Sequence, residues 1–474
     1  MAIRRLQPAG DASTGVPIDA DLAPVANGTV ATQRRERLSL TEGAPWTLFL
    51  LPGALLVVGA LVGFGELFIA VTIGLQVLFF AYFVRHFAFA ISATRSAPGD
   101  LDVIAVDSPY RPTVSVLVPC KNEEVVAEDL VHGLLALDYP PDRLQVVVVD
   151  DASTDRTAEI LDARATAEAR LEVIHRGSGA EGGKSAALNS ALERATGEII
   201  VVFDADHRPH RDVVWRLVRH FEDPGVGAVQ GRCEIHNPGD STLARLVSID
   251  YLAGYLVNEY GRQSLFQLPA YGGANCAVRA SSLRAAGGWR ECATEDTDLT
   301  LRLVLGGERV RYDVTAVDEE EGVVTLGRYW RQRYRWARGH QQAWRDYRKA
   351  IWSCPHLSWA EKIETTMFLF VFHVPVASAA GFVVLALWLA GVAHPFDPIH
   401  AFVLWTLLFL APLLELGSGL LVARSDRRNA FVLVFFLPIF LVSVALCTKA
   451  WIDGVIGRPY TWVRTTRSGA AVGG

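Results

Sequence analysis

The sequence predicts an α/β domain, built on a mostly parallel sheet with helices on both faces, inserted between transmembrane α-helices. Between residues 112 and 327, short runs of Val, Ile and Leu alternate with stretches of helical periodicity, which is the pattern of β-α-β units. Apolar blocks lie on both sides of this region, from Ala44 to about Val84 and again after residue 362. Of the 474 residues, 51% are hydrophobic and 20% are charged, a balance that fits a protein with a membrane-embedded part.

Charge and cysteine content exclude several classes of protein. The formal net charge is -6 and no domain-wide basic surface is present, so we expect no nucleic-acid partner. The six cysteines are scattered and form no C-x-x-C pair, which argues against a zinc site or a disulfide framework. This cysteine usage fits a domain that faces a reducing cytoplasm.

The N-terminal part reads as a tail followed by a membrane hairpin. Residues 1–44 are polar and aperiodic, and they predict a disordered cytoplasmic tail with a basic cluster at 34–37. A spanning helix needs about 20 residues, so the apolar stretch within 45–92 predicts two transmembrane helices, with a turn at 63–66. Basic residues flank both ends, which places both ends in the cytoplasm. Residues 93–111 are then a linker to the α/β domain.

The C-terminal transmembrane region is expected at 363–452 and contains three apolar blocks, at about 366–392, 401–423 and 430–450. The first two predict spans. The third is either another span or a re-entrant element, because Pro438 lies near its middle and a simple span would place the following basic residues outside. We therefore expect residues 453–474 to be cytoplasmic. The whole chain is expected to be a multi-pass protein of the plasma (inner) membrane.

Three strands and three helices are expected in the first half of the α/β domain. The strand segments have no polar alternation, as strands buried on both faces should, and they lie at 112–120, 144–151 and 197–206. The intervening helical stretches are 124–138, 156–169 and 182–195. Ligands of such sheets bind beyond the carboxyl ends of the strands, where this chain carries CKNEE, DDASTD and DADHRP. No strand is followed by the glycine-rich or G-x-S-x-G signatures of dinucleotide-binding, kinase-type or serine-hydrolase sites.

Two acids after the third strand segment are candidate metal ligands. Asp204 and Asp206 flank one residue, and the period of two in a strand lets both carboxylates face one cleft. Hard divalent ions such as Mg²⁺ or Mn²⁺ prefer oxygen ligands and are often shared with substrate phosphates. The alternative is that this D-x-D only begins a solvated turn.

Three further polar residues are candidates for ligand binding. Asp150 and Asp151 could hydrogen-bond a base or ribose at the mouth of the sheet, or could instead form an Asx-turn. Lys184 lies where two glycines give way to a helix, a position suited to an anionic ligand, although a lone lysine there is more often solvated.

The stretch ECATEDTDLTLRL at 291–303 concentrates acids in an otherwise apolar chain. Thr294 is a good N-cap, and acids in a first turn favour the positive end of a helix dipole, so the stretch predicts a helix start. The other interpretation is that one of these acids is a catalytic base.

An Arg- and Trp-rich helix is expected at 328–352, within a set of amphipathic interface helices at 328–362. Most of it fits a membrane interface. Gln332, Arg335, Trp336 and Gly339 share one face, where a guanidinium could offset diphosphate charge and an indole could stack on a sugar ring. The histidines of the domain stand alone in the sequence, and His175, His207 and His340 are expected to be structural.

Taken in order, the two N-terminal apolar helices, DDAST, DAD, TED and Q-R-Y-R-W (332–336) resemble the membrane-embedded processive family-2 glycosyltransferases. These are the cellulose, chitin, hyaluronan and poly-N-acetylglucosamine synthases. The resemblance covers about residues 45–467. It implies a GT-A fold at 112–327, a nucleotide-diphosphate sugar donor, an inverting transfer that builds a β-linked chain, and a divalent metal.

The resemblance also implies residue roles. Asp151, with Asp150, would hold the uridine, and Asp204 and Asp206 would serve the diphosphate and the metal. Asp296 of TED would be the general base. The remaining assignments are Lys184, Gln332 and Arg335 at the donor, Trp336, Glu295 and Gly273 at the acceptor, and WVRTTR (462–467) near the donor.

Three functions follow as hypotheses. The first is polymerisation of a β-linked polysaccharide from UDP-glucose or UDP-N-acetylglucosamine, with translocation across the lipid bilayer and an accessory export or regulatory protein as a partner. The motif Q-R-Y-R-W and the five apolar blocks favour this one. The second is non-processive transfer of one sugar to a membrane lipid. The third is a non-catalytic membrane scaffold with a relic nucleotide-binding fold. The presence of every acid of the motifs DDAST, DAD and TED argues against this third hypothesis.

Overall fold

The structure is a computed structural model that describes residues 63–95, 110–391, 398–426 and 428–458. The predicted tail, the first predicted transmembrane helix, most of the predicted linker and the element WVRTTR at 462–467 lie outside the described residues.

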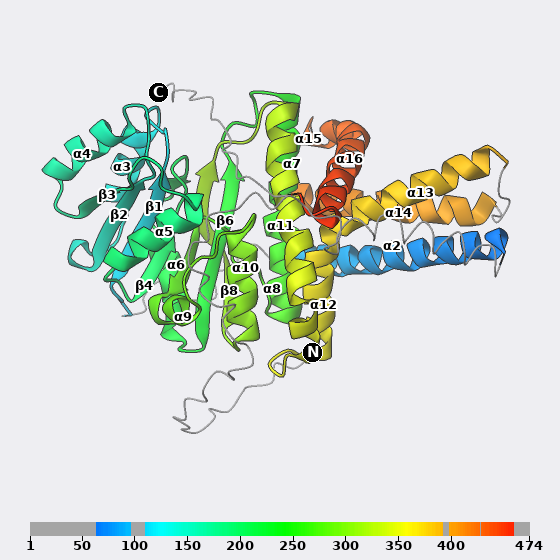
Figure 1. The fold of residues 1–474 in the computed structure, drawn as a ribbon, viewed down its shortest axis with the longest axis horizontal. Coiled ribbons are helices and arrows are strands. Elements are labelled where there is room, and N and C mark those ends of the chain that lie inside the picture. The colour runs from blue at the N-terminus through cyan, green and yellow to red at the C-terminus, as the bar shows by residue number, and fades with distance from the viewer. Residues whose placement is uncertain (1–62, 96–109, 392–397, 427, 459–474) are drawn as a thin grey trace. The chain divides into compact units, whose positions relative to one another are not determined.

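The α/β domain is built on one eight-stranded sheet with the strand order β3-β2-β1-β4-β7-β6-β8-β5 (Figure 1). The strands are β1 Val114–Cys120, β2 Leu144–Asp150, β3 Leu171–His175, β4 Ile199–Val202, β5 Arg208–Pro209, β6 Val226–Ile235, β7 Cys276–Arg279 and β8 Arg309–Glu320. β1 to β4 are mutually parallel, as expected. The second half is mixed, because β7 runs antiparallel to both β4 and β6.

Two apolar layers bury both faces of the parallel strands. Val116 and Val118 of β1 pack into one layer, with helices α3 (Ala127–Leu135), α4 (Thr157–Ala167) and α6 (Val213–Val218). Leu117, between those two valines, packs into the other layer, which includes α5 (Gly183–Arg194), α9 (Ala280–Ala285) and α10 (Glu295–Leu305). Alternate residues therefore point into opposite layers, which explains why the strands show no polar alternation.

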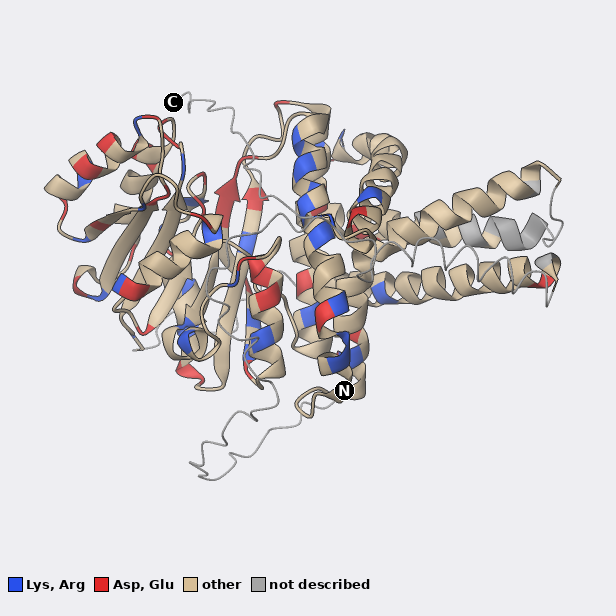
Figure 2. Ribbon diagram, in the orientation of Figure 1, with Lys and Arg blue, Asp and Glu red and all other residues tan. Residues whose placement is uncertain are grey.

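Helices with polar and apolar faces lie between the sheet and the apolar helices (Figure 1). They are α7 Thr242–Ala253, α8 Tyr260–Phe266, α11 Leu326–Ser353 and α12 Trp359–Phe370. A π-helical turn, Gly254–Glu259, joins α7 to α8. α11 begins at an N-cap, Thr325, whose hydroxyl accepts a hydrogen bond from the Arg328 N–H at 3.4 Å. Blue Lys and Arg positions run along α11 in Figure 2.

Apolar helices extend from this region. They are α2 Phe64–Arg95, α13 Val374–Leu389, α14 Pro398–Val422, the short α15 Arg428–Val432 and α16 Phe436–Val455. Among the described residues, three segments are long and apolar enough to cross a membrane: Gly65–Arg95, Trp359–Leu387 and Arg428–Val455. Pro438 is the third residue of α16, where a proline costs no hydrogen bond, so the helix does not break there.

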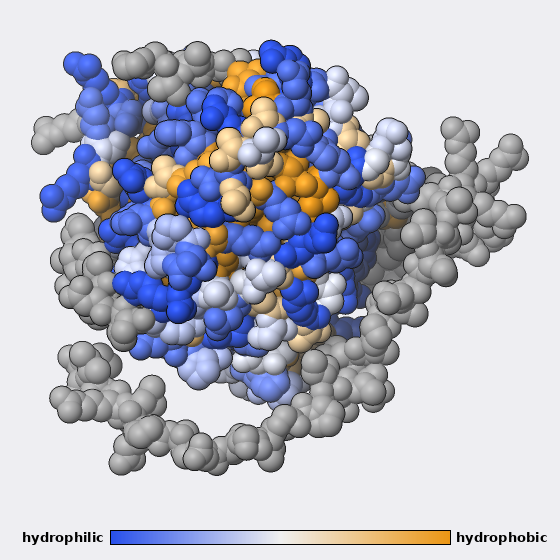
Figure 3. Space-filling view, turned by 90° about the vertical axis from the view of Figure 1, so that its left-hand side faces the viewer, coloured by the Kyte–Doolittle hydropathy of each residue, from blue (hydrophilic) through white to orange (hydrophobic). Residues whose placement is uncertain are grey.

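The sides of the α/β domain that face away from the apolar helices carry mainly hydrophilic residues around a hydrophobic area (Figure 3). This distribution fits a domain that contacts water at one end and apolar helices at the other.

We expect Leu117→Ala to lower the free energy of unfolding by about 2–5 kcal/mol, because it leaves a cavity in a core layer where Leu117 is fully buried. Val125→Ala is the matched control, because the Val125 side chain is 64% exposed. Thermal unfolding in detergent, followed by tryptophan fluorescence, compares the two variants. Equal midpoints would contradict the placement of Leu117.

Candidate active site

The carboxyl ends of β1, β2 and β3 lie at one edge of the sheet, since Cys120 pairs with Asp150 and Asp150 pairs with His175. Asp150 Oδ1 accepts a hydrogen bond from the Ser153 N–H at 3.1 Å, which is the predicted Asx-type turn, and its Oδ2 lies 3.1 Å from His175 Nδ1. Asp151 pairs with Arg176 and lies 3.4 Å from Lys121 Nζ. Both acids therefore sit where the sequence predicts, with partners inside the protein.

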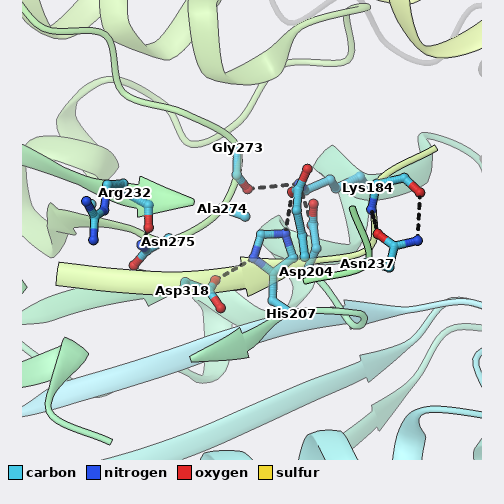
Figure 4. Close-up of polar contacts among 12 residues, drawn as sticks. Lys184, Asp204, His207, Arg232, Asn237, Gly273, Ala274, Asn275 and Asp318 are labelled. Carbon is cyan, nitrogen blue, oxygen red and sulfur yellow. Dashed lines mark hydrogen bonds and ion pairs between the residues drawn. The ribbon is translucent and has the colours of Figure 1, made fainter. Parts of the chain in front are cut away.

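Lys184, in the first turn of α5, joins three separate segments of the chain. Its Nζ lies 2.5 Å from Asp204 Oδ1 and 3.5 Å from Glu295 Oε1, and it donates a hydrogen bond to the Gly273 carbonyl at 2.8 Å (Figure 4). Burial alone would lower the pKa of Lys184, but the carboxylates of Asp204 and Glu295 outweigh this effect and raise the pKa. The lysine is thus a charged centre of the site, and the alternative of a solvated side chain is wrong.

The loop 271–275 is held tightly over this lysine. The Gly272 N–H donates to Gln230 Oε1 at 2.5 Å, and Asn275 Nδ2 donates to the Arg232 and Ala316 carbonyls, both at 2.9 Å. A Cβ at Gly273 would lie 3.2 Å from Lys184 Nζ and 3.3 Å from Asp296 Oδ2. Residue 273 therefore lies directly beside the candidate base.

The TED stretch starts α10, as predicted. Thr294 is the N-cap residue, although its side chain makes no cap hydrogen bond. Asp296 is partly buried, and its Oδ1 accepts a hydrogen bond from the Thr297 N–H at 2.6 Å, which fixes the carboxylate. Burial raises the pKa of the neighbouring Glu295; Lys184 opposes this shift and Asp296 adds to it.

Asp298 has a different role from Asp296. It lies 2.8 Å from Arg302 Nε and accepts a hydrogen bond from the Tyr347 hydroxyl at 2.5 Å. These contacts tie α10 to α11, so Asp298 is a scaffold residue. The acidic stretch thus contains both a helix start and an acid that faces the loop at Gly273.

α11 brings the predicted Gln-Arg-Trp face to the same place. Arg335 donates a hydrogen bond to the Ala293 carbonyl at 3.2 Å, and a Cβ at Gly339 would overlap the Thr294 side chain. The Gln332 Oε1 atom is buried and has no hydrogen-bond partner among the described residues. The Arg333 guanidinium lies 4.4 Å from the centre of the Trp336 ring.

One cavity of about 650 Å³ joins these groups. Its lining includes eight of the predicted site residues: Lys184, Asp204, Gly273, Glu295, Asp296, Gln332, Arg335 and Trp336. The same cavity continues between apolar side chains, among them Phe79 of α2, Leu407 of α14 and Phe440 of α16. The cavity therefore extends from the site to α14 and to α2 and α16, and the last two belong to segments that are long and apolar enough to span a membrane.

His207 is not the isolated residue that the sequence suggests. Its Nδ1 pairs with Asp318 of β8 (Figure 4), and its Nε2 lies 3.0 Å from Glu320 Oε2. Burial would lower the pKa of His207, but these two carboxylates raise it well above its ordinary value. Ligand-type atoms of His207, Cys233 and Asp318 lie within 4.8 Å of one another. Because Asp318 is 111 residues from His207, spacing could not reveal this group; the acidic run at 318–321 was the only signal.

The predicted metal ligands, Asp204 and Asp206, follow β4 directly. Asp204 lines the cavity, whereas Asp206 is buried and is not among the lining residues. Their carboxylate oxygens are of the kind that Mg²⁺ and Mn²⁺ prefer as ligands. The residues present therefore fit such an ion.

Residues 115–286 match the family described as glycosyl transferase family 2. The β-monoglucosyldiacylglycerol synthase of Synechocystis sp. is 39% identical over 296 residues, which are 62% of this chain and 60% of that protein. The probable glycosyltransferase YdaM of Bacillus subtilis is 33% identical over 362 residues, 73% of this chain and 81% of that protein. The poly-β-1,6-N-acetyl-D-glucosamine synthase of Staphylococcus aureus is 28% identical over 237 residues, 49% of this chain and 56% of that protein.

Among solved structures, the mannosyltransferase PcManGT of Pyrobaculum calidifontis, in complex with GDP-Man and Mn²⁺, superimposes with a TM-score of 0.55. The two chains are 25% identical, and the match covers 81% of this chain and 99% of that one. The GT-A fold expected from the sequence is thereby confirmed.

We expect Asp296→Asn to lower the rate of sugar transfer by about 10²–10⁴-fold, because an amide cannot take the proton of the attacking hydroxyl. Glu291→Gln, at an exposed position of the same stretch, is the control and should retain full activity. Transfer is measured with a radiolabelled nucleotide sugar, and folding by size-exclusion chromatography. Substantial activity in a folded Asp296→Asn variant would refute the assignment.

Proposed function

The chain belongs to glycosyl transferase family 2, and we propose that it transfers one sugar from a nucleotide-sugar donor to a membrane lipid, with inversion at the anomeric carbon. The observation that carries this proposal is the single cavity that joins Asp296 to apolar side chains of α2, α14 and α16. A water-soluble donor and a membrane-dissolved acceptor could meet at Asp296 without either leaving its own medium.

The relatives favour this function over polysaccharide synthesis. The relative named for a glucosyl lipid is 39% identical to this chain, whereas the poly-N-acetylglucosamine synthase is 28% identical over a shorter stretch. The polymerisation hypothesis depended on Q-R-Y-R-W and on the number of apolar blocks. Neither feature discriminates between acceptors, because a lipid glycosyltransferase also needs a donor diphosphate site and a membrane anchor. UDP-glucose is the donor we propose, by analogy with the glucosyl relative.

In this proposal the donor lies across the sheet edge. Asp150 and Asp151 hold the uridine, while Gln332, Arg335 and Lys184 face the diphosphate. The Lys184 ammonium is preorganised there by its contacts with Asp204 and the Gly273 carbonyl, so it stabilises negative charge on the leaving group without reorganising. A Mg²⁺ or Mn²⁺ ion held by Asp204 and Asp206 would neutralise further diphosphate charge.

The proposed reaction is a one-step displacement. The acceptor hydroxyl oxygen bonds to the anomeric carbon as the bond from that carbon to the diphosphate oxygen breaks. The hydroxyl proton passes to the Asp296 carboxylate, and the nucleoside diphosphate leaves with the electron pair. Glu295 and Gly273 line the acceptor side, and Trp336 offers an indole face to the sugar ring.

We propose further that the enzyme resides in the plasma membrane with its α/β domain in the cytoplasm, where nucleotide sugars are made. A lipid acceptor makes the bilayer a partner as well as an anchor. A growing polysaccharide and an export protein are not needed for this function.

The purified protein in nanodiscs containing diacylglycerol, supplied with Mg²⁺ or Mn²⁺ and labelled UDP-glucose or UDP-N-acetylglucosamine, tests the function. We expect one labelled glycolipid and one released UDP for each sugar transferred. A labelled product of high molecular weight would instead support the polymerisation hypothesis. If the protein neither releases UDP nor binds the donor, the result would favour the non-catalytic scaffold.

Removal of divalent ions by EDTA should lower transfer by more than about 100-fold, and added Mn²⁺ or Mg²⁺ should restore it, since the ion offsets diphosphate charge. Asp206→Asn should raise the ion concentration needed for half-maximal activity. Unchanged transfer after EDTA treatment would exclude the role given to Asp204 and Asp206.

A further inference from the structure

A group of polar and charged side chains lines the cavity between Asp296 and its apolar end. It consists of Arg85 and His86 of α2, Asn258 and Glu259 of the π-helical turn, Arg262 of α8 and Glu415 of α14. We call it the polar girdle. Such groups are costly to bury next to apolar helices, and a set of them that lines a cavity points to a ligand.

Each cationic side chain of the girdle is matched by a carboxylate. Arg85 forms two hydrogen bonds with Glu364, at 2.9 and 2.7 Å, and both side chains are buried. Arg262 lies 3.2 Å from the same carboxylate and 3.5 Å from Glu259 Oε1. His86 Nδ1 lies 2.5 Å from Glu415 Oε2. Two guanidiniums and one imidazole thus face three carboxylates, which leaves no excess positive charge for an anionic ligand.

Arg262 Nε and Nη1 and His86 Nδ1 are buried without a hydrogen bond, but each lies beside a carboxylate. One acceptor atom of the girdle has neither a hydrogen bond nor an ion-pair partner among the described residues. Asn258 donates through Nδ2 to Glu415 Oε1, while Asn258 Oδ1 is buried and has no hydrogen-bond partner among the described residues. A buried amide oxygen without a partner costs free energy, so it fits a site that a hydroxyl donor completes.

The backbone fixes this geometry. Asn258 lies in the π-helical turn. Such turns are rare in proteins as a whole, and those that occur are often at functional sites. The helices on either side of the turn are locked in place, because a Cβ at Gly419 of α14 would meet the Ala253 backbone, and a Cβ at Gly261 would meet the Phe89 ring. The turn therefore holds Asn258 and Glu259 between α2 and α14.

The girdle is also connected to the catalytic loop. Glu259 Oε2 accepts a hydrogen bond from the Ala270 N–H at 2.7 Å, and Ala270 precedes the loop that carries Gly273. On the other side, the Arg262 guanidinium lies 3.8 Å from the centre of the Phe368 ring. The same ring contacts His340, which lies on α11 one turn after Trp336. The girdle, Asp296 and the apolar side chains therefore line one continuous cavity.

We propose that the polar girdle binds the hydroxylated headgroup of a neutral lipid, with Asn258 and Glu415 as specificity residues, and excludes lipids that carry a phosphate. This inference rests on the proposed transfer to a lipid. A hydroxyl can donate to Asn258 Oδ1 or to a carboxylate, whereas a phosphate would face Glu415 and Glu259 with no unpaired cation.

The first test uses the wild-type enzyme in nanodiscs with labelled UDP-glucose and three acceptors: 1,2-diacylglycerol, phosphatidylglycerol with the same acyl chains, which carries free hydroxyls as well as a phosphate, and a polyprenyl phosphate. We expect the neutral lipid to be used more than about 100-fold better than either phosphate. Equal or better use of a phosphate-bearing acceptor would overturn the inference while leaving lipid transfer intact. Glycolipid from no acceptor, or a polymer instead, would overturn the proposed function itself.

The second test uses variants of the girdle. Asn258→Leu should raise the KM for diacylglycerol about tenfold and change kcat much less, because the lost acceptor atom contacts the headgroup and not the reacting atoms. Glu415→Gln keeps a hydrogen-bond acceptor for Asn258 but removes a charge, so it should reduce the preference for diacylglycerol over phosphatidylglycerol about tenfold. Ser418→Ala, one turn along α14, is the matched control. An unchanged KM in folded Asn258→Leu would remove Asn258 from the site.

Discussion

The site is organised around one ammonium group. Lys184 Nζ contacts Asp204, the Gly273 carbonyl and Glu295, and these belong to a strand end, a loop and a helix start that are far apart in the chain. Without this cation, the buried carboxylate of Glu295 and the partly buried carboxylates of Asp204 and Asp296 would repel one another. The requirement for close approach then explains Gly273, since any side chain there would crowd both Lys184 and Asp296.

The sequence predicted best what local patterns encode. The Val-rich runs located β1, β2 and the start of β4 within two residues, because strands buried on both faces need uninterrupted apolar residues. The predicted third segment ran four residues past the end of β4. The acids after these strands, and the shared face of Gln332, Arg335 and Trp336, followed from the same periodicities. The mixed second half of the sheet did not, because the antiparallel β7 is four residues long and gives little signal. The pairing of His207 with Asp318 depends on contacts between distant strands, which no spacing rule anticipates.

The identity of the acceptor lies beyond the motifs for a similar reason. The motifs are assigned to the donor diphosphate, the base and one stacking surface, and enzymes with different acceptors can share all three. In our proposal, acceptor choice depends on the polar girdle, where Asn258 meets Glu415 across 157 residues and Arg85 meets Glu364 across 279. In the sequence, the girdle corresponds to a histidine and several charged residues within apolar helices. Such residues look like ordinary interruptions of a hydrophobic pattern, so they do not predict a site.

For the proposed lipid acceptor, the cavity that joins Asp296 to α2, α14 and α16 makes the reaction rate depend on two different measures of concentration. The nucleotide sugar is dissolved in water, so its concentration is an amount per litre. The lipid is confined to the bilayer, so its concentration is a mole fraction of the membrane. Dilution with inert lipid then slows the reaction even when the total amounts of enzyme and acceptor stay the same. Product formation in a cell would accordingly follow the composition of the membrane around the enzyme, and the cytoplasmic level of the sugar donor would act as a separate control.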